Sequence, residues 1–135
     1  MAVRDRTHVQ NNLYRKIIES YVEAYNRFDV AGMLLSADPA IAFENISNGK
    51  VTLRTNGLDE LRKQAEESKG YFIERKQVIK EMKFGDGVVE AIVDFSGILA
   101  ADLPGGLKAG EKIEVKGRSI FKFRNDRIIG ITDLS

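Results

Sequence analysis

Apolar residues recur at helical spacing near the start of the chain. A broad apolar stripe of this kind usually faces a core, and Thr7 followed by Gln10 has the form of a capping box at a helix start. The pattern therefore predicts a helix from about residue 7 to residues 26–28. Its stripe contains, at every fourth position, Leu13, Ile17, Tyr21 and Tyr25.

A second, shorter helix is predicted directly after the first. Asp29 has the side chain of a helix cap, and the apolar residues 33–35 follow it. Asp38 ends this helix because it precedes Pro39, and the residue before a proline avoids the helical region. Two short strands are predicted next, over residues 41–46 and 51–54.

The remainder of the chain predicts one more helix and then a run of antiparallel strands. Leu58, Leu61 and Ala65 mark the buried side of the helix, which Asn56 caps and Gly70 ends. The apolar period then changes from helical to alternating, which leaves one face of each strand apolar. Helices followed by such strands indicate an α+β fold, with the helices over the concave side of a curved sheet. The strands are predicted at residues 71–84, 88–101, 113–123 and 127–134.

The composition is that of an ordinary globular domain. A chain of 135 residues is long enough for one domain and too short for two. Its formal net charge of +1 provides no field that would attract nucleic acid, and Glu111 and Glu114 interrupt the basic residues of the last strands. We therefore expect a single domain, residues 1–135, with no nucleic-acid partner.

The absence of cysteine and the single histidine limit the kinds of catalytic and metal site that the chain can form. The chain has no cysteine, which excludes disulfides and thiolate catalysis and suits a cytoplasmic location. His8 is the single histidine, so neither a Ser-His pair in the folded body nor a multi-histidine metal site is expected. No apolar stretch approaches the roughly 18 residues of a membrane span. We expect a cytoplasmic protein with no membrane partner, no metal and no cofactor.

Four short motifs, taken with the order of the elements, resemble the nuclear-transport-factor-2-like superfamily, in its SnoaL-like and ketosteroid-isomerase-like branch. The motifs are AYNRFD at the helix end, Asp38-Pro39 before a strand, FEN at the strand end, and GLDELR in the third helix. The resemblance implies a cone-shaped, cystatin-like fold in which three N-terminal helices pack on a curved, mainly antiparallel sheet. It also implies a pocket for a small apolar molecule and a homodimer that forms through the sheet.

Ketosteroid isomerases in this superfamily use an aspartate base, a helix tyrosine and a protonated aspartic acid. The resemblance places Tyr21 at the tyrosine position. Asn45 stands at the position of the base, and an amide has no basic lone pair with which to take a proton. Ser119 stands at the position of the second oxygen-stabilising donor, where it offers only a hydroxyl.

The epoxide-hydrolase branch gives a second comparison. There, an asparagine and a tyrosine help to hold a water molecule, while two aspartates with an arginine between them act as base and acid on the epoxide. Asn45 resembles that asparagine. Asp94 and Asp133 resemble the two aspartates. However, Ile92 occupies the place of the arginine between them, and Phe43 occupies that of a tyrosine.

Each candidate residue also has a structural interpretation. Asn45 either holds a ligand or satisfies loop backbone, and Tyr21 either lines a pocket or fills the core. Ser119 either contacts a ligand or makes room for a facing helix. Alternation directs Asp94 away from the apolar face, where it would be a solvated carboxylate, and Asp133 is a candidate only if the last strand pairs.

We expect a small-molecule pocket with Tyr21 stabilising charge on oxygen and Asp94 or Asp133 moving a proton. This predicts a cofactor-free isomerase, cyclase, hydratase or epoxide hydrolase that acts on a small apolar substrate. The alternative is a non-catalytic ligand-binding or protein-interaction module of the same fold. The predicted ligand contacts are Asn45, Ser119, Ile17, Phe43, Phe95 and Phe121.

Overall fold

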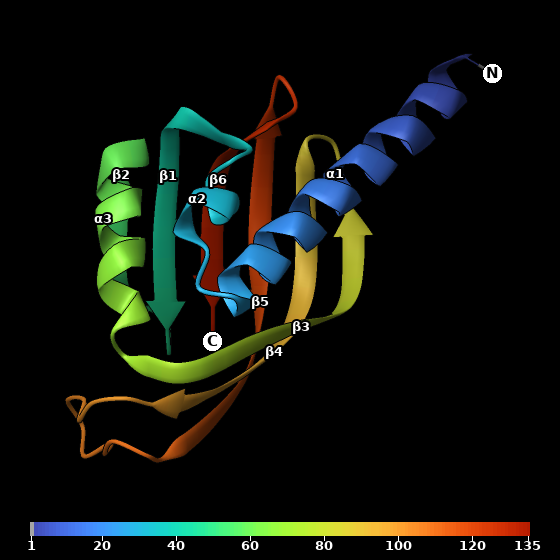
Figure 1. Ribbon diagram of the computed structural model, residues 1–135. Helices are drawn as coiled ribbons and strands as arrows, with labels where there is room; N and C mark the ends of the chain where they lie inside the picture. The colour runs from blue at the N-terminus through green and yellow to red at the C-terminus, as the bar shows by residue number, and fades with distance from the viewer. Residues whose placement is uncertain (1) are drawn as a thin grey trace.

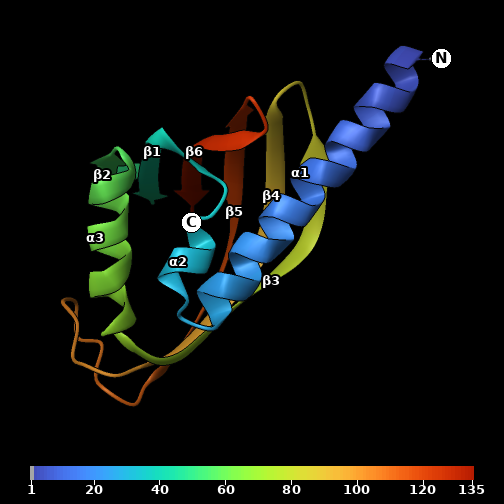
Figure 2. The same cartoon turned by 45° about the horizontal axis from the view of Figure 1, so that its top comes forward.

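Three helices cover one side of a six-stranded sheet, with the short α2 between α1 and α3 (Figure 1, Figure 2). The computed structural model describes residues 2–135, with side chains from residue 7 onward. The strands lie in the order β2-β1-β6-β5-β4-β3, and all neighbours are antiparallel except β1 and β6, which are parallel. The α+β class is confirmed. The elements are α1 (Ala2–Asn26), α2 (Val30–Met33), β1 (Ala37–Ser47), β2 (Lys50–Asn56), α3 (Leu58–Lys69), β3 (Phe72–Phe84), β4 (Val88–Leu99), β5 (Lys112–Arg124) and β6 (Arg127–Leu134).

Within residues 2–135, two helices precede the sheet and α3 follows β2, so the expectation of three N-terminal helices is corrected. The predicted start of α1 was also wrong, because the helix begins at Ala2 and runs through Thr7 and Gln10. A capping sequence marks a helix start only where the backbone before it leaves the helical conformation. Here that backbone stays helical.

Local capping chemistry explains the other two helices. Asp29 caps α2 as predicted, since its carboxylate accepts a hydrogen bond from the Gly32 backbone N–H at 2.9 Å. The N-cap of α3 is Gly57 and not Asn56. The Glu60 carboxylate reaches back instead and accepts from the Asn56 N–H at 2.9 Å. The cap of α3 is therefore supplied by a residue inside the helix.

Pro39 lies inside β1, which begins earlier than predicted. The pairing of β1 with β6 skips from Ala37 to Ala42, and the pairing with β2 begins only at Ala42. The proline thus occupies a stretch with no paired neighbour, where its missing N–H costs no ladder hydrogen bond. The structure tolerates a proline here that sequence reasoning treated as a boundary.

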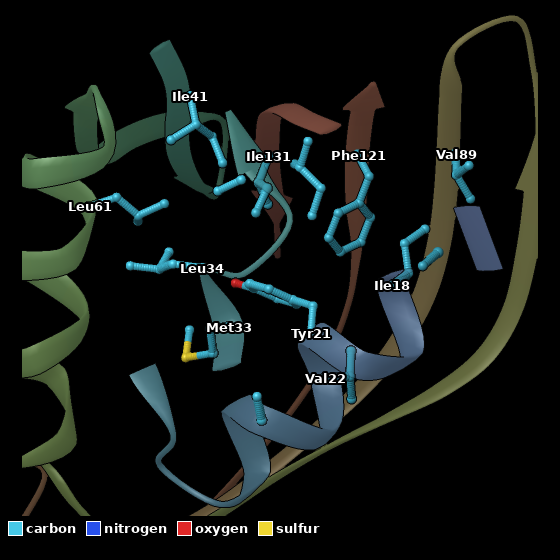
Figure 3. Close-up of a cluster of buried hydrophobic side chains, with 14 of the residues drawn as sticks. Ile18, Tyr21, Val22, Met33, Leu34, Ile41, Leu61, Val89, Phe121 and Ile131 are labelled. Carbon is cyan, nitrogen blue, oxygen red and sulfur yellow. The ribbon is translucent and has the colours of Figure 1, made fainter. Parts of the chain in front are cut away.

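The core lies between the helices and the central strands, and it includes side chains from α1, α2 and α3 (Figure 3). The predicted alternation is confirmed in β4, where Val89, Ala91 and Val93 are buried. The same face is less covered farther along the sheet, because Phe95 is half-buried and Val115 is 38% exposed. The apolar face therefore opens at one end. None of the helices within residues 2–135 has the length and apolar character that a bilayer crossing requires.

Candidate functional site

Two adjoining hollows lie at the open end of the core. The first, which we call the sheet-side hollow, has a volume of about 230 Å³ and an apolar end formed by Val93, Phe95 and Val115. The second, the helix-side hollow, has a volume of about 310 Å³ and extends beneath α3. Its apolar side chains are Met33, Phe43, Leu53 and Leu61.

The two hollows share a polar wall. Four residues line both of them, and each comes from a different element: α1, β1, β3 and β6. The parallel pairing of β1 with β6 sets two of these side by side, and the register of β5 with β6 adds Ser119 opposite Asp133. The shared residues are Tyr25, Asn45, Gln77 and Asp133.

Asp133 is the central acid of this wall. The Ser119 hydroxyl donates a hydrogen bond to Oδ1 of Asp133 at 2.6 Å. Burial raises the pKa of Asp133 to about 6, and the hydrogen bond from Ser119 opposes the rise. Both protonation states are therefore accessible near neutral pH, which is what a group that takes and returns a proton requires.

Two phenols accompany this acid. Tyr21 is 8% exposed, packs edge-on against Phe121 with 5.7 Å between ring centroids, and lines the helix-side hollow. In Figure 3 its side chain extends from α1 toward Leu34, with the oxygen at its tip. Burial, together with the negative charge of Asp133, raises the pKa of Tyr21. The phenol therefore stays protonated and acts as a hydrogen-bond donor.

Tyr25 is a site residue that sequence reasoning missed. It belongs to the same helical stripe as Tyr21, but it is one turn farther along and lines both hollows. Burial raises the pKa of Tyr25 to about 12; the charge of Arg75 opposes this rise and that of Asp133 adds to it. Its position in the stripe was visible in the sequence, whereas its access to the hollows was not.

Arg75, which sequence reasoning also missed, packs against the Tyr25 ring. The guanidinium lies 3.7 Å from the Tyr25 ring centroid and 4.6 Å from that of Phe28, and Nε donates to the Tyr25 carbonyl at 2.9 Å. Arg75 is 4% exposed and has no ion-pair partner among the side chains of residues 7–135. Burial lowers its pKa. An arginine that alternates with Gln77 on the inner face of a strand was the available sequence signal.

Asn45 is fixed by the neighbouring strand. Its Nδ2 donates to the Thr52 hydroxyl at 2.7 Å, and that hydroxyl donates to the Asn45 carbonyl at 3.3 Å. The amide therefore has a set orientation in the wall of both hollows and does not serve a turn. Gln77 is held through its backbone, which exchanges two hydrogen bonds with the Asn26 side chain at 2.7 and 3.1 Å.

The structure does not bring every predicted site residue to this wall. Asp94 lies on the outer face of β4, because its neighbours Val93 and Phe95 point into the sheet-side hollow. Phe121 is 2% exposed and belongs to the core. Ile17 lines a smaller hollow of about 150 Å³, which has Tyr21 and Met33 in common with the helix-side hollow. A catalytic role for Asp94 would require it on the inner face.

The other predicted ligand contacts lie against the two hollows. Phe43 lines the helix-side hollow, and Phe95 and Ser119 line the sheet-side hollow. In the part of the chain whose side chains the structure describes, no group of three or more histidine, aspartate or glutamate residues is placed to hold a metal ion. The shared polar wall thus consists of one acid, one phenol and two amides, with the Tyr21 phenol in the helix-side hollow and the Ser119 hydroxyl in the sheet-side hollow beside it.

Comparisons with known proteins bear on the fold. No family model matches the sequence, and no curated protein matches it. Solved structures do match. A protein from Xanthomonas campestris pv. campestris that is assigned as a polyketide cyclase is 18% identical, with a TM-score of 0.76 over 93% of this chain and 92% of that one.

Two further structures extend the likeness. An NTF2-like protein of unknown function from Burkholderia pseudomallei is 15% identical, with a TM-score of 0.70 over 90% of this chain and 88% of that one. An LEH-like epoxide hydrolase from M. tuberculosis is 13% identical, with a TM-score of 0.69 over 88% of this chain and 79% of that one. At these identities the likeness concerns the fold and not the activity. The chain has the nuclear-transport-factor-2-like fold.

Proposed function

We propose that this protein is a cofactor-free enzyme that moves a proton on a small, mostly apolar substrate containing a carbonyl or related oxygen. The observation that carries the proposal is the Ser119–Asp133 pair, in which Asp133 lies in the wall that the two hollows share, near the phenols of Tyr21 and Tyr25. Structural neighbours assigned as a polyketide cyclase and an epoxide hydrolase have the same fold, and this is consistent with such a site.

The roles follow from the chemistry of each group. The Asp133 carboxylate takes a proton from the carbon next to the carbonyl, and the bond electrons move onto the carbonyl oxygen. The phenols of Tyr21 and Tyr25 donate hydrogen bonds to that oxygen as negative charge develops on it. Protonated Asp133 then returns the proton to the same carbon or to another one. Asn45 orients the substrate, because its amide cannot act as a base.

Exchange of carbon-bound protons in heavy water tests this function. A panel of neutral aryl and cyclic ketones is incubated with the protein and followed by proton NMR. We expect faster exchange than in buffer for at least one ketone. Tyr21→Phe and Tyr25→Phe should each slow that exchange by about a hundredfold, since each removes one donor to the developing oxyanion.

Tyr71→Phe is the matched control, because Tyr71 is 41% exposed and lies outside the hollows. Its exchange rate should equal that of the unsubstituted protein. Exchange that is equally fast in both inner variants would remove the phenols from the mechanism.

The second candidate function is a non-catalytic binding module. The observation in its favour is Asn45, an amide at the strand end where the ketosteroid-isomerase comparison has an acid. Ketones that bind without exchanging their protons would support this candidate over the enzyme.

We also propose that two copies pair through the outer face of the sheet, as the family resemblance implies. That face carries half-buried Ile92, Ile98 and Ile120 and the 39% exposed Val78. Ile92→Lys would place a charge in this interface, and we expect it to shift the protein from dimer to monomer in analytical ultracentrifugation. Leu35→Lys is the control, since Leu35 is 82% exposed near α2. A protein that sediments as a monomer at every concentration would contradict the pairing.

A further inference from the structure

The two hollows suggest the shape of the ligand. Small-molecule sites usually have volumes of roughly 300–1,000 Å³. The sheet-side hollow, at about 230 Å³, falls below that range, and the helix-side hollow, at about 310 Å³, lies at its lower limit. Because they adjoin at Asp133 and its neighbours, a ligand that enters both has a site of ordinary size.

We propose that the ligand is two-ended: a neutral, elongated molecule with a hydrogen-bonding oxygen near its middle and an apolar group at each end. This inference rests on the proposed function, and it adds the class of substrate. One end lies in the sheet-side hollow, the other lies in the helix-side hollow, and the oxygen meets the shared wall.

The apolar ends of the hollows carry the first part of this inference. In the sheet-side hollow, the Phe95 ring meets the rings of Tyr25 and Phe72 edge-on, with centroids 6.3 and 5.6 Å apart. A flat group placed there adds to an existing aromatic cluster. In the helix-side hollow, Met33, Leu53 and Leu61 offer aliphatic contacts. Each end therefore gains by burying apolar surface.

The shared wall carries the second part. The side-chain amide of Gln77 has no hydrogen-bond partner among residues 7–135, and only one Asp133 carboxylate oxygen is engaged there, by Ser119. Both side chains are half-buried and line the two hollows, where they can meet a ligand. A carbonyl oxygen at the middle of the ligand can accept from the Gln77 amide N–H, and a hydroxyl there can also donate to the second Asp133 oxygen.

The charges around the hollows favour a neutral ligand. Arg118 lines the sheet-side hollow, but its guanidinium pairs with Glu90 at 3.1 Å. The charged group that lines the helix-side hollow is Asp133 itself, which repels an anion. Arg75 is a cation, but it is turned toward the rings of Tyr25 and Phe28. An anionic end would therefore lack a partner in either hollow, whereas a cationic end would pair with Asp133, which the proposed function requires as a base.

The test uses three probes and two blocking variants. Dibenzyl ketone has two apolar ends and a central oxygen, benzyl methyl ketone lacks one end, and diphenylpropane lacks the oxygen. Val115→Phe narrows the sheet-side hollow and Leu53→Phe narrows the helix-side hollow; both positions are partly exposed on strands. Matched controls are Val9→Phe, 65% exposed on α1, and Val51→Phe, 47% exposed on β2, both outside the hollows. Thermal unfolding checks that each variant folds.

Isothermal titration calorimetry should find dibenzyl ketone bound at least roughly tenfold more tightly than the other two probes. Each blocking variant should weaken the binding of dibenzyl ketone by roughly tenfold or more. The binding of benzyl methyl ketone should be weakened by only one of the two variants. The control variants should bind all three probes as the unsubstituted protein does.

The outcomes separate this inference from the proposed function. If only one blocking variant affects dibenzyl ketone, the two-ended ligand is wrong even where proton exchange is catalysed. If both variants weaken binding but no ketone exchanges its protons, the two-ended site stands and the catalytic proposal falls. If none of the three probes binds, the two-ended ligand is wrong.

Discussion

Asp133→Asn is expected to lower the rate of proton exchange by about a hundredfold to ten-thousandfold, which is the range for loss of a general acid or base. Asparagine keeps the shape of the side chain and can still accept the hydrogen bond from Ser119, but it cannot take a proton. In the unsubstituted protein the exchange rate should rise with pH through about 6 as the Asp133 carboxylate forms. The variant should lose that rise.

The same variant has an expected effect on stability. Because burial raises the pKa of Asp133 to about 6 from its ordinary value of 3.8, the unfolded chain ionises first as the pH rises. Below pH 3.8 the group does not change the free energy of unfolding with pH. Between the two values the unsubstituted protein loses stability, and above about 6 the loss is complete, at most roughly 3 kcal/mol.

The amide introduced by Asp133→Asn is neutral in the folded and the unfolded state. This variant should therefore unfold at higher denaturant concentration than the unsubstituted protein at pH 8, and with little difference at pH 3. Urea titrations at the two pH values measure this. Asp94→Asn, on the outer face, should leave the exchange rate unchanged. Full exchange activity in Asp133→Asn would show that another group moves the proton.

Arg75→Ala is expected to lower the free energy of unfolding by about 2–4 kcal/mol, the range for a cavity left in a packed interior. The substitution removes the guanidinium from between the Tyr25 and Phe28 rings and leaves the Tyr25 carbonyl without its donor. Arg75→Lys should recover little of the loss, because an ammonium lacks the planar fork that stacks on a ring.

Urea unfolding at one pH measures the effect of Arg75. The matched control is Arg62→Ala, whose side chain is 51% exposed and pairs with Asp59 at 3.2 Å within α3. An exposed pair of this kind is worth about 1 kcal/mol or less. If Arg75→Ala and Arg62→Ala unfold at the same urea concentration, the stacked guanidinium does not hold the end of α1 in place.

Local patterns predicted most of the elements. The strands from β3 to β6 agree with their predicted bounds to within a residue or two, because alternation and the glycines of the Gly85–Gly87 turn act over short stretches of chain. The cap at Asp29 was predicted for the same reason, since a side chain three residues from its backbone partner depends on nothing farther away.

Local patterns also placed some of the functional residues and left others undecided. Alternation alone directed Asp94 to the outer face, where the structure places it. The family resemblance pointed to Tyr21, although the helical stripe itself does not distinguish Tyr21 from Tyr25. Which of the two reaches the shared wall depends on how α1 lies across the sheet.

By itself, then, the sequence determined the α+β class, the strands β3 to β6 and the alternation of faces along them, because these depend on neighbours within a few residues. Only the tertiary structure decided the strand order, the parallel pairing of β1 with β6 and the position of Asp133 beside Ser119 and Asn45. These contacts join segments far apart in the chain. Their selection depends on the burial of the whole core, which no local pattern contains.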